Sequence, residues 1–266
     1  MQEPGKILVS MTSYPGRIKN VGISIFLLLE QQTLPPDEVH LWLAEPQFPN
    51  KEADLPEDLQ KVIKHPKVKL HWLPENTYVH KRHEIFKTAA KGSLVFLIDD
   101  DVMYSPDLIE KVVERHMKWP DAIVCYNRYH EHKYSGKRIL YTGHPKDDGR
   151  YVNRFRWCGQ SMIPTDVYPI EILDSEHQEV RDRCSPISDE CWFQPWIVFN
   201  RIPITYMNYD WGTDIDPRNG KDNGIVSFSH RKDANGLEKR DNWLGSVLDA
   251  YPEIKQVYEK ELGYEK

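Results

Sequence analysis

The sequence predicts an α/β fold in which helices flank a mainly parallel central sheet. In the first 120 residues, short apolar runs alternate with segments of helical periodicity, as in successive βαβ units. One apolar run, residues 94–98, is followed directly by Asp99, Asp100 and Asp101. Open α/β sheets bind their ligands at the carboxyl ends of the strands. We therefore expect a ligand site around this Asp cluster.

The predicted elements follow in chain order. We expect strands at residues 6–11, 38–44, 68–72 and 94–98, and helices at 21–31, 55–63 and 81–91. A further helix should follow Ser105-Pro106-Asp107, which supplies its cap. Beyond residue 120 we expect strands at 122–126, 204–207 and 225–229, helices at 166–173, 187–199 and 241–262, and a long irregular loop or hairpin at 127–160.

Composition and charge exclude several classes of protein. A net charge of −6 over 266 residues implies no general affinity for nucleic acid. The four cysteines lack Cys-x-x-Cys spacing and are expected to be free thiols. The N-terminus has no apolar signal-peptide core, and the longest aliphatic run, Ile25 to Leu29, is too short to span a bilayer. We expect a cytoplasmic protein, with peripheral contact at the inner membrane left open.

The Asp cluster has no evident structural task, because the next helix already has its own cap. On extended backbone Asp99 and Asp101 would point to one side and Asp100 to the other. Two carboxylates so close repel each other, and a divalent cation between them would resolve that repulsion. The pattern therefore predicts a metal or ligand site.

Two basic segments suit a phosphate-containing ligand. The loop Thr12 to Arg17 follows the first strand and offers Tyr14 for stacking on a base and Arg17 for phosphate. An ordinary turn would also explain Tyr14-Pro15-Gly16. The run His80-Lys81-Arg82-His83 opens a predicted helix, where cations oppose the helix dipole and so suggest a bound anion such as a diphosphate. The alternative is a solvated surface cluster.

Two later segments could complete a catalytic site. Asp189 and Glu190 open a predicted helix, as its dipole favours, but Asp189 also heads a face formed by Trp192, Phe193 and Trp196. Either acid could be the general base against a sugar hydroxyl, and the sequence leaves that choice open. His230 ends a predicted strand, and its imidazole would shift an oxygen site from magnesium toward manganese.

Taken in order, these motifs resemble those of GT-A-type glycosyltransferases, most closely the bacterial family-2-like enzymes of cell-surface polysaccharide synthesis. The matching stretches are Met11 to Arg17, Asp99 to Val102, Cys158 to Ser161 and Ser188 to Phe193, which together cover most of residues 6–207. The resemblance implies a metal-dependent transfer from a nucleotide-diphosphate sugar, with UDP-sugar the first choice, to a glycan or lipid-linked acceptor.

The resemblance also implies a role for each matching residue. Asp99 or Asp100 would touch the nucleotide and Asp101 the metal, Mn²⁺ or Mg²⁺. The expected nucleotide-sugar contacts are Thr12, Ser13, Tyr14, Arg17, Lys81, Asp99, Asp100, Gly159 and Gln160. The expected metal ligands are Asp99, Asp101 and His230; the acceptor contacts are Trp157, Trp192 and Trp196; and the catalytic pair is Asp189 and Glu190.

We expect a single GT-A (Rossmann-like) domain, residues 1–266. Its nucleotide-sugar-binding half would span about 1–120, and its acceptor-binding half, with a C-terminal helical segment, about 121–266. A sugar-1-phosphate nucleotidylyltransferase would require a long glycine-rich loop after the first strand, where this chain has only Gly16. A non-catalytic carbohydrate- or nucleotide-binding module would explain the aromatic residues but not the acidic pair.

Overall fold

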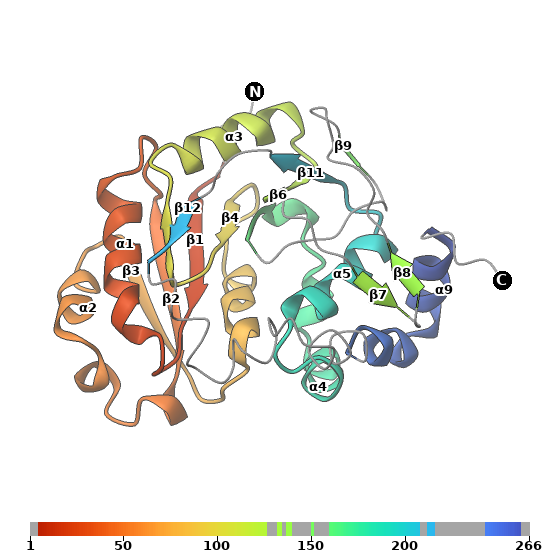
Figure 1. Cartoon of the computed structure of the whole chain (residues 1–266), viewed down its shortest axis with the longest axis horizontal. Helices are drawn as coiled ribbons and strands as arrows, with labels where there is room; N and C mark the ends of the chain where they lie inside the picture. The colour runs from red at the N-terminus through yellow and green to blue at the C-terminus, as the bar shows by residue number, and fades with distance from the viewer. Residues whose placement is uncertain are drawn as a thin grey trace.

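The centre of the fold is an eight-stranded sheet in the order β3-β2-β1-β4-β10-β6-β11-β9 (Figure 1). The structure is a computed structural model, and it describes residues 5–126, 132–134, 137–139, 150–151, 160–207, 212–215 and 243–261. The strands are β1 (Ile7–Thr12), β2 (Glu38–Ala44), β3 (Val68–Leu73), β4 (Leu94–Leu97), β6 (Ile123–Tyr126), β9 (Arg150–Tyr151), β10 (Ser161–Pro164) and β11 (Ile204–Met207). Strands β3, β2, β1 and β4 are mutually parallel, as are β6 and β11. The predicted α/β fold with a mainly parallel sheet is confirmed.

Two small sheets lie beside the main one. Strand β5 (Val102–Tyr104) pairs antiparallel with β12 (Gly212–Asp214), so the segment that follows the Asp cluster is held by a distant part of the chain. Strands β7 (His132–Tyr134) and β8 (Lys137–Ile139) form a second antiparallel pair.

Helices cover both faces of the sheet. The α-helices are α1 (Val21–Glu30), α2 (Glu57–Val62), α3 (Leu108–Lys118), α4 (Ser175–Cys184), α5 (Asp189–Phe199) and α9 (Pro252–Glu261), and residues 243–250 are also helical. The 3₁₀ segments are η1 (Ile18–Asn20), η2 (Glu45–Gln47), η3 (Lys51–Asp54), η4 (Tyr78–Lys87), η5 (Thr165–Val167) and η6 (Ile170–Leu173). Figure 1 shows α4, α5 and α9 at the opposite side of the molecule from α1 and α2.

Side-chain alternation along the strands divides the core in two. Val9 and Met11 of β1 face a core that includes residues of α1, α2 and α3. Leu8 faces the other core, with η4, α5 and the C-terminal helices. Within the described residues, no helix is both long and apolar enough to cross a membrane.

Two expected helices were wrong, and one strand was not expected. The helix expected at 81–91 is the 3₁₀ helix η4, which starts at Tyr78. The helix expected at 166–173 is two 3₁₀ turns, because Pro169 removes a backbone donor and disfavours helical backbone at the residue before it. Strand β10 was not predicted; it has four residues and ends in Pro164, and proline is uncommon in central strands. The strand expected at 225–229 lies outside the described residues.

Candidate active site

The Asp cluster lies on a turn rather than on extended backbone. Strand β4 ends at Leu97, and the chain turns at residues 100 and 101 before β5 begins. Arg17 Nη2 is 2.7 Å from Asp100 Oδ1 and also forms an ion pair with Asp101 Oδ1. The expectation that Asp100 points away from Asp101 was therefore wrong, because the alternation of a strand stops where the chain turns.

The loop Thr12 to Arg17 is tightly packed next to the Asp cluster. Thr12 closes β1, and its hydroxyl donates a 2.8 Å hydrogen bond to the Trp42 carbonyl. Ser13 is buried next to it. A Cβ atom at Gly16 would lie 2.6 Å from a ring carbon of Tyr14, so only glycine lets that ring fold back over the loop. The expected nucleotide contacts of this loop thus lie together at the carboxyl end of β1.

Several buried polar atoms around the loop have no hydrogen-bond partner among the described residues. They are Ser13 Oγ, Tyr14 Oη, Arg17 Nε, Asn20 Nδ2 and Asp100 Oδ2. Burial raises the pKa of Asp100, although Arg17 opposes the shift. Buried polar groups are normally hydrogen-bonded, so this concentration is what a site for a polar ligand would show. The sequence did not reveal Asn20, because an Asn before an apolar helix is typical of a cap, yet its side chain makes no cap bond.

Lys81 is a buried cation that, among the described residues, has no carboxylate beside it. The residue is only 1% exposed, and its Nζ donates a 2.8 Å hydrogen bond to Asn76 Oδ1. No carboxylate of the described residues lies within ion-pair distance of Nζ. Burial lowers the pKa of Lys81 to about 8, with Asp100 opposing the shift. Because His80, Arg82 and His83 are buried as well, the alternative of a solvated surface cluster is excluded.

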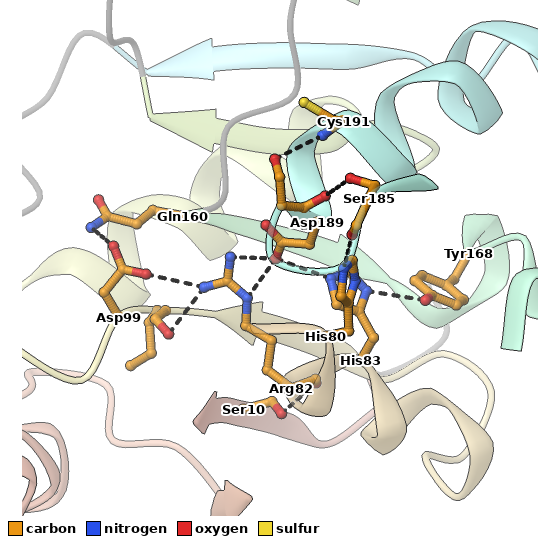
Figure 2. A network of polar contacts seen from close by, with 12 residues as sticks. Ser10, His80, Arg82, His83, Asp99, Gln160, Tyr168, Ser185, Asp189 and Cys191 are labelled. Atoms are coloured by element: carbon orange, nitrogen blue, oxygen red, sulfur yellow. Dashed lines mark hydrogen bonds and ion pairs between the residues drawn. The ribbon is translucent and has the colours of Figure 1, made fainter. Parts of the chain in front are cut away.

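Arg82 joins the Asp cluster to the first turn of α5 (Figure 2). Its Nε and Nη2 lie 2.9 and 2.5 Å from Asp189 Oδ2, and its Nη1 lies 3.1 Å from Asp99 Oδ1. Gln160 Nε2 donates to the other oxygen of Asp99, at 2.7 Å. His83 Nε2 lies 3.3 Å from Asp189 Oδ2. The structure thus brings Asp99, Gln160 and Asp189 together, although the sequence separates them widely.

The two acids that open α5 have different surroundings. Ser188 caps the helix by accepting a 3.2 Å hydrogen bond from the Cys191 amide. Burial would raise the pKa of Asp189, but Arg82 and His83 outweigh it and hold the pKa far below its usual range. A carboxylate held in this way is a weak base. Glu190 is only half-buried.

The two tryptophans expected to bind the acceptor lie in the hydrophobic core. Trp192 is 2% exposed and Trp196 is 5% exposed. The Trp196 ring packs edge-on against Tyr251, with centroids 5.1 Å apart. A sugar could reach either ring only by opening this core, so the structure favours a packing role for both. Trp157, Gly159 and His230, also expected in the site, lie outside the described residues.

The carboxylates of the cluster fit a divalent cation in donor type but do not form a complete site. Asp100 and Asp101 converge on one cation, the Arg17 guanidinium, and Asp100 Oδ2 is unpartnered. Both oxygens of Asp99, in contrast, are hydrogen-bonded. Hard cations such as Mg²⁺ and Mn²⁺ prefer such oxygen ligands. In the part of the chain that the structure describes, no three His, Cys, Asp or Glu side chains group so that they could hold a metal ion.

Among the solved structures that this chain resembles, one supports the fold. The S. aureus TarS 1-349 structure in complex with UDP-GlcNAc is 13% identical in sequence and has a TM-score of 0.50. The match covers 97% of this chain and 71% of the TarS chain. The TarS 1-349 structure without a named ligand is 13% identical, covers 96% and 74%, and has a TM-score of 0.46. The complex with UDP is 14% identical, covers 92% and 71%, and also has a TM-score of 0.46. No curated protein matches the sequence.

The sequence itself identifies the family. The model of glycosyl transferase family 2 matches residues 26–167, more than half of the chain, including β2, β3, β4 and the Asp cluster. Together with the GT-A arrangement of the sheet, this match shows that the chain belongs to glycosyl transferase family 2 and is a nucleotide-sugar-dependent glycosyltransferase.

Proposed function

We propose that this glycosyltransferase moves a sugar from a UDP-sugar to a hydroxyl of a glycan or lipid-linked acceptor, with Mn²⁺ or Mg²⁺ as cofactor. Its place would be surface polysaccharide synthesis on the cytoplasmic side of the inner membrane. The whole chain, residues 1–266, would act as one domain with a donor half and an acceptor half.

The observation that carries this proposal is the buried charge of Lys81. A buried cation without a counter-ion is costly, and it becomes favourable when an anion fills the space beside it. Lys81 and Arg17 both lie close enough to Asp100 to feel its charge. A diphosphate at this point would receive hydrogen bonds from both cations, and the unpartnered donors of the first loop would face the rest of the nucleotide.

Other residues of the site would bind the ribose, the metal and the donor sugar. The Asp99 side chain is 40% exposed and could accept a hydrogen bond from a ribose hydroxyl. The sequence suggested Asp99, Asp101 and His230 as metal ligands, but both oxygens of Asp99 are already hydrogen-bonded. We therefore assign the metal to Asp100 and Asp101, with His230; it would stabilise negative charge on the departing diphosphate. Gln160, fixed on Asp99, and Gly159 beside it would line the donor sugar.

The acidic pair would serve the acceptor side. We assign proton removal to Glu190, because Asp189 is already committed to Arg82 and His83. In one displacement, the acceptor oxygen bonds to the anomeric carbon and its proton passes to Glu190. The bond from that carbon to the phosphate oxygen breaks, and the nucleoside diphosphate leaves.

Calorimetric titration with UDP in the presence of Mn²⁺ tests the donor half of this proposal. Lys81→Met should weaken binding about 10–100-fold, the scale of a lost hydrogen bond to a charged group. In the wild type, affinity should fall as the pH rises from 7 to 9, because Lys81, with a pKa of about 8, loses its charge over that interval. Lys81→Arg should bind with little change over the same interval, since a guanidinium stays protonated.

Lys91→Met is the matched control, because it removes an exposed lysine from the loop that follows the same segment. It should bind UDP like the wild type. Wild-type affinity in Lys81→Met, or no UDP binding by the wild-type protein, would contradict the donor assignment.

A further inference from the structure

Arg82 lies where three segments of the site meet. It belongs to η4, its Nη1 contacts Asp99 and the Ile98 carbonyl at the end of β4, and its Nε and Nη2 contact Asp189 at the start of α5. Figure 2 shows the guanidinium between the two carboxylates.

Hydrogen bonds from two strands of the sheet hold the backbone of Arg82 in place. Ser10 of β1 donates a 2.7 Å hydrogen bond to the Arg82 carbonyl, and Trp42 of β2 donates a 2.9 Å hydrogen bond to the Ser10 hydroxyl. The guanidinium is planar and holds Asp189 through two nitrogens, so it sets the direction as well as the distance of that carboxylate. A continuous chain of hydrogen bonds therefore runs from two strands of the sheet to the first turn of α5.

Arg82 also supplies the positive charge that pairs with both Asp99 and Asp189. Burial brings the pKa of His80 to about 3 and lowers that of His83, so both rings are largely neutral at pH 7. The side chains of Arg82 and Asp189 are 3% and 5% exposed, which leaves little water to replace a lost contact. Removing one partner from such a buried pair is strongly unfavourable.

From this geometry we infer that Arg82 is a positioning residue for the transfer reaction. It holds the first turn of α5, and with it Glu190, in a fixed place relative to the donor-side Asp99. The inference rests on the proposed function, in which Glu190 accepts the proton. Arg82 touches neither the donor nor the acceptor in this scheme, so its loss should lower the turnover number and leave donor affinity nearly intact.

Kinetics of nucleotide-sugar hydrolysis, in which water replaces the acceptor, test this inference. Arg82→Lys should lower kcat about 10–100-fold, since a displacement of about 1 Å can cost that much, while the KM for donor changes less than about threefold. Asp189→Asn should cause a loss of similar size. The double variant should be little worse than either single one, because both break the same link. The pH–rate profile of the single variants should keep its wild-type shape, because the proton acceptor is still present.

Leu59→Ala is the control for stability alone. Leu59 belongs to α2 and is fully buried in the other core, so this variant should lower the melting temperature without changing kcat at a temperature where it stays folded. Equal losses of kcat in Leu59→Ala and Arg82→Lys would overturn the inference. So would an Arg82→Lys variant that weakens donor binding as much as turnover, or strictly multiplicative effects in the double variant.

Amide hydrogen exchange tests the positioning without any turnover. In the ligand-free protein, Arg82→Lys should speed exchange in the first turns of α5, residues 189–195, and Leu59→Ala should not. Unchanged exchange in α5 would overturn the inference even if the proposed function holds. Failure of every nucleotide sugar to react would overturn the proposed function, while the exchange result would still decide the role of Arg82 in holding α5.

Discussion

Glu190→Gln is expected to lower the rate of sugar transfer by about 10²–10⁴-fold, the usual cost of losing a general base. UDP affinity should stay near the wild-type value, because Glu190 lies on the acceptor side of the scheme. The acidic limb of the pH–rate profile should disappear as well, since glutamine has no carboxylate to titrate. Steady-state rates across pH, with UDP binding measured in parallel, give all three results.

Asp189→Asn provides the internal comparison. The pKa of Asp189 is held far below its usual range by Arg82 and His83, so this carboxylate has little tendency to take a proton. We expect a smaller loss of rate and a retained acidic limb. If Asp189→Asn abolishes the limb and Glu190→Gln transfers at nearly the wild-type rate, the assignment is reversed and Asp189 is the base.

Asp101→Asn is expected to remove the dependence of UDP binding on metal and to lower activity by at least about 10–100-fold. Losses of this size follow even from removing groups that only support a metal ligand. Arg17 would keep its contact with Asp100, so the loop should stay folded. His230→Ala should weaken manganese-supported activity in the same direction.

Activity measured against Mn²⁺ and Mg²⁺ concentration checks this prediction. Glu114→Gln on α3 is the control, because it removes a carboxylate that pairs with Lys111 on the surface. UDP binding that is equally tight in excess chelator would contradict the metal assignment. So would an Asp101→Asn variant that responds to metal like the wild type.

The sequence predicted those parts of the fold that local patterns determine. Apolar runs bounded by turns located β1, β2, β3, β4, β6 and β11 within a residue or two. The acids Asp189 and Glu190 located the start of α5, which was expected at residue 187 and begins at Asp189. These features follow from backbone preferences and from the period of burial, which a single sequence records.

Contacts between distant segments could not be predicted in the same way. Arg82 and Asp189 are 107 positions apart, and no local pattern indicates that one guanidinium will bind two carboxylates. The tryptophans of α5 show the same limit. Their helical spacing fits either an acceptor platform or a core, and packing against Tyr251 from the C-terminal part of the chain decides between the two.

The orientation of the Asp cluster was the third such case. Alternation is reliable within a strand, but a sequence of Leu-Ile-Asp-Asp-Asp does not show where the strand ends. Strand β4 ends at Leu97, and the turn that follows brings Asp100 and Asp101 to the same guanidinium.

One measurement tests the central claim most directly. The wild-type protein is incubated with Mn²⁺ and a panel of nucleotide sugars in water enriched in oxygen-18, and the products are identified by mass spectrometry. A glycosyltransferase of this kind should slowly release a free nucleoside diphosphate and place the label on the sugar, because the bond to the anomeric carbon breaks. Release of a sugar-1-phosphate would instead reveal cleavage within the diphosphate, as in a nucleotidylyltransferase. That product, or tight nucleotide binding without any reaction across the panel and added glycan acceptors, would contradict the account.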